Sequence, residues 1–180
     1  MLAHAKTMRY SAGILPYAMV RGTLYVLIGK DVRDNTWSDF GGKSEEMDGG
    51  SPIETAIREF YEETCGVVMD LKALRNRMSV PANYSMLLSQ TQNCHPYYMY
   101  LLEVPYNTGY RSIFRKLLYF MKYKKIYKKF MEKTDIQWIS LQSLINRRVM
   151  LRSVFEATID KHLEAIRRVQ RPVPFSERLA

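Results

Sequence analysis

The stretch from Ser51 to Gly66 constrains this chain most strongly, because it predicts a helix with both ends marked. Ser51 is a good N-cap residue, and Pro52 suits the first helical position. Glu54 follows the cap at the spacing of a capping box, and Gly66 suits the position that ends a helix. The residues at helical spacing on one side are Ile53, Ile57, Phe60 and Thr64. We expect this face to lie in the core.

Three glutamates, Glu59, Glu62 and Glu63, lie at i, i+3 and i+4 on the other side of this helix. Like charges at this spacing repel by about 0.2–0.5 kcal/mol per pair, and the C-terminal half of a helix already disfavours negative charge. A solvated acidic surface is one interpretation. A divalent cation that offsets the repulsion is the other, since Arg58 offsets only part of it. Oxygen ligands alone favour Mg²⁺ or Mn²⁺ over zinc.

The rest of the chain predicts mainly strands, followed by helices near its C-terminal end. Strands are expected at residues 10–19, 24–28, 67–80, 97–104 and 135–140, with one short strand within 79–93. Arg21-Gly22 signals a hairpin between the first two. Ser140 is expected to cap a short helix through Ile145, and Ser153 with Glu156 to open the last helix with a capping box. Neither a repeat nor a linker is apparent, so we expect a single domain over residues 1–180.

Residues 58–63 read REFYEE, which resembles the REUxEE core of the Nudix box, where U is a bulky apolar residue. The upstream Gly41-Gly42-Lys43 resembles the glycine turn that opens that box. The resemblance to Nudix hydrolases extends from about Met8 to the helix near Leu163. It implies an α/β fold, the Nudix-type α/β/α sandwich with a mixed sheet, to which this chain adds a basic helical insertion at about residues 111–133.

The chain departs from this pattern around the helix. The box glutamate expected eight residues before Arg58 is replaced by Gly50, and the spacing from Gly42 to Arg58 is two residues longer than usual. The extra residues lie in an acidic loop at 45–50. The glycine expected after the glutamates is Cys65, with Gly66 one step later. We therefore expect altered contacts at the helix start and a cap shifted by one residue.

The resemblance also implies roles for individual residues. The expected metal ligands are the Gly41 carbonyl, Glu59, Glu62 and Glu63, and the catalytic base is either Glu59 or Glu62. Lys43 is a candidate for contact with a substrate phosphate, and Arg58 is expected to pair with a neighbouring glutamate. A further acid often precedes the tryptophan strand in this family. The candidates here are Glu132 and Asp135, for which a plain surface position is the alternative.

Residues 111–133 carry most of the charge of the protein. They contain nine Lys/Arg and one acid, and so supply +8 of the formal net charge of +9. Their pattern is helical, with a bend or break expected near residues 119–122. Three interpretations remain open: a solvated lysine face, a surface for a polyanion such as an RNA backbone, and a membrane-surface helix. The candidate substrate-binding residues in this segment are Lys124, Lys125 and Lys128.

These features favour an enzyme that hydrolyses organic diphosphate linkages with Mg²⁺ or Mn²⁺. Capped RNA is the favoured substrate, because the basic segment provides for an RNA body. The alternatives are a diphosphoinositol polyphosphate, a free nucleoside triphosphate, a diphosphate sugar, or an RNA-binding module without catalysis. Two cysteines, no signal peptide and no long apolar run predict the cytoplasm or another reducing compartment.

Overall fold

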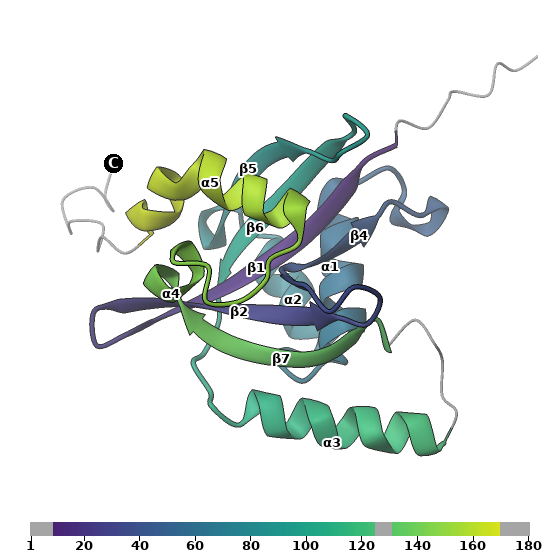
Figure 1. Ribbon diagram of the computed structural model, residues 1–180. Coiled ribbons are helices and arrows are strands. Elements are labelled where there is room, and N and C mark those ends of the chain that lie inside the picture. Colours follow the sequence, from purple (N-terminus) through teal and green to yellow (C-terminus); the bar gives the residue numbers. More distant parts are fainter. Residues whose placement is uncertain (1–8, 125–130, 170–180) are drawn as a thin grey trace, which may run out of the picture.

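The computed structural model describes residues 9–124 and 131–169, which form a mixed β-sheet with helices on both of its faces (Figure 1). The strands are β1 (Ser11–Val20), β2 (Thr23–Asp31), β3 (Trp37–Ser38), β4 (Phe40–Lys43), β5 (Tyr84–Gln90), β6 (Pro96–Glu103) and β7 (Lys133–Ser140). The helices are α1 (Pro52–Thr64), α2 (Leu71–Met78), α3 (Tyr110–Tyr123), α4 (Leu141–Ile145) and α5 (Ser153–Arg168), with 3-10 turns η1 (Glu46–Asp48) and η2 (Pro81–Asn83). None of these helices is long and apolar enough to cross a membrane.

The sheet is organised around β1. This strand pairs antiparallel with β2 and β4 and parallel with β6, while β7 and β3 both pair with β2, and β5 pairs with β6. Residues 12–16 of β1 are all buried. A strand covered on both faces carries such a continuous buried run, without the alternation of a half-exposed strand.

Each face of the sheet carries its own hydrophobic core. One core contains Phe60 and Phe114 and lies beneath α1, α2 and α3. The other contains Leu15 and Phe155 and lies beneath α4 and α5. This layering confirms the predicted α/β/α sandwich with a mixed sheet. The predicted core face of α1 is also confirmed, with Ile57, Phe60 and Thr64 buried and Ile53 partly buried against the same core.

Most of the predicted strands are confirmed, and so is the first hairpin. Arg21 and Gly22 have φ angles of 48° and 77° in the turn that joins β1 to β2. Two-residue turns with positive φ at both positions match the twist of the flanking strands. The Ser140 side chain accepts a hydrogen bond from the Ser143 backbone N–H, so the predicted cap of α4 is confirmed.

The strand predicted at residues 67–80 is wrong, because this part of the chain contains α2. The Asp70 side chain caps α2 by accepting a hydrogen bond from the Ala73 backbone N–H at 2.9 Å. Leu74 and Met78, four residues apart, are both buried. The apolar Val67 and Val68 precede the helix, so their strand propensity does not describe the residues that follow.

Both predicted capping boxes are also wrong. Ser51 makes no side-chain cap on α1, and Glu54 instead pairs with Arg75 of α2 at 2.9 Å. Ser153 lies inside α5, where its hydroxyl accepts a hydrogen bond from Gln92. Glu156 pairs with Arg147 at 2.7 Å. In both cases a tertiary ion pair takes the glutamate that local spacing assigned to the helix start.

Within the described residues, the basic segment is helical up to Tyr123, as predicted. α3 buries Tyr110, Phe114, Leu118 and Met121, which lie on one side of the helix. Ile113 and Phe120 are apolar too, but they lie off this side and are about half exposed. The helix ends at Tyr123, close to the predicted break, and Lys124 is exposed. Lys125 and Lys128 lie outside the described residues.

Two arginines fasten α3 to the sheet through one carboxylate. Arg111 and Arg115 each donate two hydrogen bonds or more to Asp135 of β7, with the shortest N–O distance 2.6 Å for each. The Asp135 side chain is only 9% exposed. Burial opposes its ionisation, but the hydrogen bonds from the two guanidiniums outweigh burial and hold its pKa below the usual 3.8.

We expect Asp135→Asn to lower the free energy of unfolding by about 1–2 kcal/mol at pH 7, since both guanidiniums are half exposed and water replaces part of the interaction. The folded-state pKa of Asp135 is lowered, so its contribution is present above pH 3.8 and is lost as the pH falls below that value. Urea unfolding at pH 7 and pH 3 checks this. The difference between wild type and variant should shrink at pH 3, and an unchanged difference would contradict the pKa assignment. Glu103→Gln, at an exposed end of β6, serves as the control.

Candidate functional site

The glycine turn of β4 lies directly against β1 and α1. A Cβ on Gly41 would be 2.6 Å from the Gly13 Cα and 2.8 Å from the Ala12 carbonyl oxygen, so only glycine permits this approach of β4 to β1. The Gly41 N–H donates a hydrogen bond of 2.8 Å to Glu63 Oε2. A Cβ on Gly42 would collide with the carboxylate of Glu59. The turn thus places its backbone beside two of the predicted glutamates.

Arg58 joins this turn to the glutamates and to the acidic loop. Its guanidinium donates to Asp48 at 2.8 and 3.0 Å, to the Lys43 carbonyl at 2.9 Å and to Glu59 at 2.9 Å. It lies 3.6 Å from Glu62 Oε2 and 3.4 Å from Glu45 Oε1. Only 9% of the side chain is exposed, so these ion pairs are largely removed from water. The predicted pairing of Arg58 with a neighbouring glutamate is present, within a larger network.

Asp48 is a site residue that the sequence reasoning missed. Besides the two bonds from Arg58, its carboxylate accepts hydrogen bonds from the Thr55 hydroxyl at 2.7 Å and the Glu45 N–H at 2.8 Å. Burial opposes ionisation, but these donors hold the pKa of Asp48 below its usual range. The two residues between Asp48 and the helix cap, Gly49 and Gly50, both have positive φ angles.

The position of Asp48 also explains the two departures before the helix. The usual box has its glutamate eight residues before the arginine, and the Gly42-to-Arg58 spacing here exceeds the usual one by two. Counting forward from Gly42 therefore puts the expected acid at position 48, with Gly49 and Gly50 as the added residues. Counting backward from Arg58 puts it at Gly50. The forward count would have found Asp48 from the sequence.

Helix α1 holds the three glutamates in an environment that water scarcely reaches. Glu62 and Glu63 are 9% and 2% exposed, respectively. The pKa of Glu59 is raised to about 7. Burial is the main cause, Arg58 opposes it, and the charges of Glu62 and Glu132 add to it. Burial likewise raises the pKa of Glu63 to about 8, with further contributions from Glu59 and Asp39, while Lys133 opposes the shift. Acids that raise one another's pKa in this way share a common region of negative potential.

A buried lysine that the sequence did not single out lies behind these acids. Lys133, the first residue of β7, is fully buried, and its Nζ lies 3.3 Å from Glu63 Oε1. The same Nζ donates to the Ser38 hydroxyl at 2.9 Å. Asp39 is buried next to it, and accepts a hydrogen bond from the Tyr97 hydroxyl. No pattern in the sequence distinguishes this lysine from the exposed ones that precede it.

The two candidates for a further acid lie in different environments. The charge of Glu132 raises the pKa of Glu59, so Glu132 lies within electrostatic reach of the glutamates, and it also pairs with Arg33 at 3.2 Å. Asp135 instead pairs with Arg111 and Arg115 of α3. The side chain of Lys43 is exposed at the end of β4, on the same turn as the site, whereas Lys124 lies at the end of α3.

The donor chemistry of the site fits Mg²⁺ or Mn²⁺. Glu59, Glu62, Glu63 and the Gly41 carbonyl offer only oxygen atoms, and burial raises the pKa of Glu59 and Glu63 despite the nearby Arg58 and Lys133. Within residues 9–124 and 131–169, no group of three His, Cys, Asp or Glu side chains is already arranged to hold a metal ion. In this structure Arg58 and Lys133 provide the positive charge at the glutamates.

A cavity of about 250 Å³ opens beside this network. It lies between η1, α1 and α2 and borders Glu62 and Arg58. Its other lining residues are Met47, Asp48, Glu54, Tyr61, Leu71 and Arg75. The cavity offers an apolar and aromatic surface next to the charged groups.

Comparisons with known proteins bear on the fold. No protein-family model and no curated protein matches the chain. The NUDIX domain of Shewanella oneidensis NrtR, solved with ADP ribose, is 14% identical over 87% of each chain, with a TM-score of 0.55. A Listeria monocytogenes protein described as a putative NUDIX hydrolase is 12% identical over 91% of this chain and 98% of its own (TM-score 0.51). C. elegans Ap4A hydrolase is 14% identical over 88% and 96% (TM-score 0.50). At these identities the likeness shows a shared Nudix fold.

Substitutions in the glycine turn should separate its structural effect from its effect on the site. Gly41→Ala forces a methyl group against the backbone of β1, so we expect a loss of about 1–3 kcal/mol in the free energy of unfolding. Gly42→Ala meets only the flexible end of Glu59, so we expect a loss on the order of 1 kcal/mol or less together with a displaced carboxylate.

Thermal unfolding with and without Mg²⁺ measures both effects, because a ligand that binds the folded state raises the melting temperature. Wild type should be stabilised by Mg²⁺, and Gly42→Ala should keep most of its basal stability but lose most of this increase. Equal basal destabilisation by the two substitutions would contradict the geometry.

Proposed function

We propose that the protein is a divalent-cation-dependent hydrolase of organic diphosphate linkages in nucleotide-type substrates, with capped RNA as its favoured substrate. The observation that carries this proposal is the cluster of Glu59, Glu62 and Glu63, which are desolvated and held beside the Gly41-Gly42 turn. Keeping such acids together in a fold opposes stability, and a role in holding cations explains their arrangement.

The groups that would hold the cation are the carboxylates of Glu59, Glu62 and Glu63 and the carbonyl of Gly41. When bound, Mg²⁺ or Mn²⁺ neutralises charge on the diphosphate oxygens and lowers the pKa of a water molecule. A cation beside these acids also favours their ionised forms and lowers the pKa of Glu59 from about 7.

The side chains of this chain provide the remaining functions. Glu59 or Glu62 accepts the proton of the water that attacks phosphorus, and the bond from phosphorus to the bridging oxygen breaks to give two phosphorylated products. The ionised carboxylate, which a bound cation favours, is the form that accepts this proton. Arg58 positions both acids through its contacts of 2.9 Å and 3.6 Å. Lys43 contacts a substrate phosphate from the exposed end of the turn, and Glu132 supports the site electrostatically.

Two features of the chain favour a nucleotide substrate. The cavity beside Glu62 has apolar and aromatic walls, including Tyr61 and Leu71, which suit a substrate group larger than phosphate. The fold is shared with an NrtR domain solved with ADP ribose and with a hydrolase named for Ap4A, and both of these compounds are adenosine nucleotides. We therefore place a nucleotide-type diphosphate ahead of a diphosphoinositol polyphosphate.

The basic segment favours capped RNA among nucleotide substrates. It carries +8 of the formal net charge. Its last two residues are Glu132 and Lys133, and Lys133 begins β7. The lysines of this segment that are not paired within the described part of the protein, such as Lys124, would hold the backbone of an RNA whose cap is cleaved. Lys124, Lys125 and Lys128 are the proposed contacts within it.

We also propose that residues 1–180 form a single domain and that the protein works in a reducing compartment. Neither Cys65 nor Cys94 forms a disulfide within the described residues. Burial raises the pKa of Cys65 to about 12, so that this thiol is unreactive at neutral pH. Cysteines that form no disulfide suit the cytoplasm or another reducing compartment.

Glu62→Gln tests the hydrolase proposal against a binding module without catalysis. Because the substitution removes a cation ligand or the base, Mg²⁺-dependent cleavage of cap-labelled RNA should fall by about 10²–10⁴-fold. RNA affinity, measured by fluorescence anisotropy, should remain within about twofold. Retained cleavage would contradict the assigned role of Glu62. Glu103→Gln is the matched control and should cleave at the wild-type rate.

Replacement of Lys124, Lys125, Lys128 and Lys129 by Ser tests the contact with the RNA backbone. Each lysine that neutralises a phosphate adds about 0.7 to the slope of log affinity against log salt for a single strand. We expect the variant to bind RNA with a flatter slope than the wild type, measured between low and moderate salt. An unchanged slope would show that these lysines form only a solvated face.

A further inference from the structure

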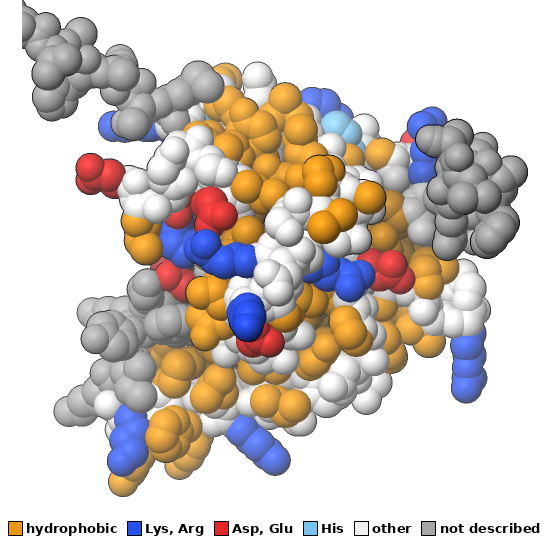
Figure 2. Space-filling model, turned by 180° about the vertical axis from the view of Figure 1, so that it is seen from behind, with side chains coloured by type: hydrophobic (Ala, Val, Ile, Leu, Met, Phe, Trp, Pro, Cys, Tyr) orange, Lys and Arg blue, Asp and Glu red, His pale blue; other side chains and the backbone are white. Residues whose placement is uncertain are grey.

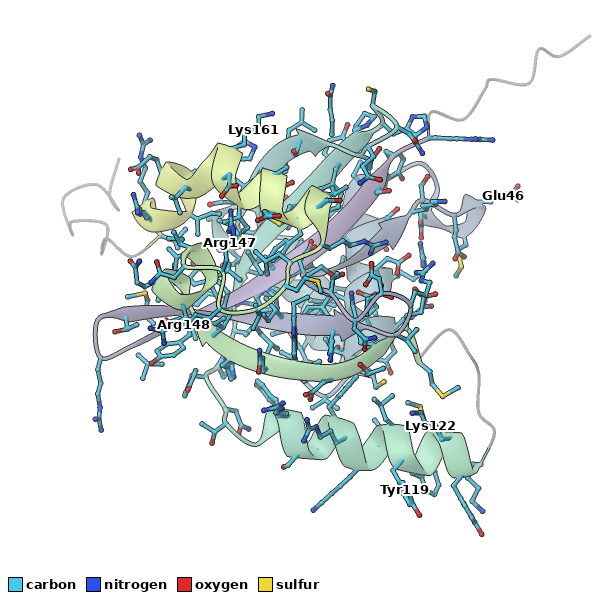
Figure 3. The ribbon with its side chains drawn as sticks, viewed as in Figure 1. Glu46, Tyr119, Lys122, Arg147, Arg148 and Lys161 are labelled. Carbon is cyan, nitrogen blue, oxygen red and sulfur yellow. The ribbon has the colours of Figure 1, made fainter. Side chains whose placement is uncertain are left out.

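The outward face of α3 combines exposed aromatic rings with lysines. Tyr119 and Tyr123 are 76% and 75% exposed, and lie one helical turn apart on the side opposite the buried residues. Figure 3 shows Tyr119 pointing away from the sheet. Phe120 is 51% exposed on the flank of this face. Side chains of this size are rarely left in water without a use, particularly when several share one face.

The cations of this face are available for an outside partner. The α3 sequence, YRSIFRKLLYFMKY, contains no acid. Arg111 and Arg115 are held by Asp135, but Lys116, Lys122 and Lys124 are exposed, and Lys124 lies 5.6 Å from the ring of Tyr123. In Figure 2, hydrophobic and basic side chains alternate along the lower edge, where α3 lies. A polyanion with flat apolar groups complements such a surface.

The arrangement favours nucleic acid over a lipid surface. A helix that lies in a membrane interface inserts a continuous apolar face, with its charges on the opposite side. The apolar stripe of α3, formed by residues 110, 114, 118 and 121, is instead packed into the core of the protein. Lys116 lies one turn before Tyr119 and Phe120 on the outward face, where insertion into lipid would bury its charge.

We infer that the outward face of α3 is a binding platform for single-stranded RNA, on which Tyr119 and Tyr123 stack with bases while Lys116 and Lys122 contact phosphates. Aromatic side chains one turn apart, about 6 Å along the helix axis, present successive stacking surfaces. Stacking tolerates any base, so the platform binds without regard to sequence. This inference rests on the proposed RNA substrate, and it assigns base contacts to a segment whose proposed role is otherwise electrostatic.

The test measures the binding of a fluorescein-labelled, unstructured 20-nucleotide RNA to the full-length protein by anisotropy at several salt concentrations. Tyr119→Ala/Tyr123→Ala should lose about tenfold or more in affinity with an unchanged salt slope, since stacking releases no counterions. Tyr119→Phe/Tyr123→Phe keeps both rings and should bind within about twofold of wild type. Lys116→Ser/Lys122→Ser should flatten the slope by about 0.7 per lysine. Lys161→Ser, on α5 across the sheet, is the control.

Several outcomes would overturn the inference. One is an RNA affinity of the alanine variant equal to that of the wild type. Another is an equal loss of RNA affinity in the alanine and phenylalanine variants, because this would assign the contact to the hydroxyl groups. Thermal unfolding checks that the variants are folded, as expected for side chains three-quarters exposed. If the alanine variant bound RNA as the wild type does but no longer bound anionic phosphatidylserine vesicles, the face would be assigned to membranes instead.

The RNA-binding platform and the proposed hydrolase function can fail independently, and the experiments distinguish the two failures. A wild-type protein that cleaves capped RNA while the alanine variant binds RNA normally would leave the proposed function and remove the platform. A wild-type protein that cleaves no diphosphate, but whose RNA binding depends on the two rings, would leave the platform and remove the proposed function.

Discussion

The network around Arg58 determines the geometry of the whole site. One guanidinium contacts Asp48 of η1, the Lys43 carbonyl of β4 and Glu59 of α1, so it joins three segments that would otherwise be connected only through the chain. Because the group is almost completely buried, losing one partner would leave an uncompensated charge. The register of the glycine turn against α1 therefore depends on this residue.

The charges of the site are balanced in an unusual way. Arg58 compensates the glutamates from the loop side, and the buried Lys133 compensates Glu63 from the side of the sheet. Burial, together with the neighbouring acids, still raises the pKa of Glu59 to about 7 and that of Glu63 to about 8. A divalent cation would favour the ionised form of both acids, and it would need to compete with the two internal cations. The proposed activity thus depends on how these fixed charges and the bound cation share the same carboxylates.

Local patterns predicted the fold and the centre of the site, but not the long-range contacts that complete it. The glutamates, the core face of α1 and the strand that contains Trp138 were visible because their spacing is periodic or resembles a family motif. Asp48 was missed because the expected acid was counted from the arginine, across two added glycines. Lys133 was missed because burial of a lysine depends on tertiary structure. Asp135 and Glu132 could be separated only once α3 was seen to hold Asp135, and α2 was mistaken for a strand because Val67 and Val68 precede it.

The most direct test of this account is the Mg²⁺-dependent turnover of wild-type protein on a small panel: cap-labelled RNA, free cap dinucleotide, a nucleoside triphosphate and a diphosphoinositol phosphate. The account predicts that capped nucleoside diphosphate is released from long RNA only when Mg²⁺ is present, and faster than from the free dinucleotide. Preference for a small diphosphate would contradict the choice of RNA but keep the hydrolytic site. The absence of Mg²⁺-dependent cleavage of every diphosphate would contradict the central claim that the three glutamates form a hydrolytic centre.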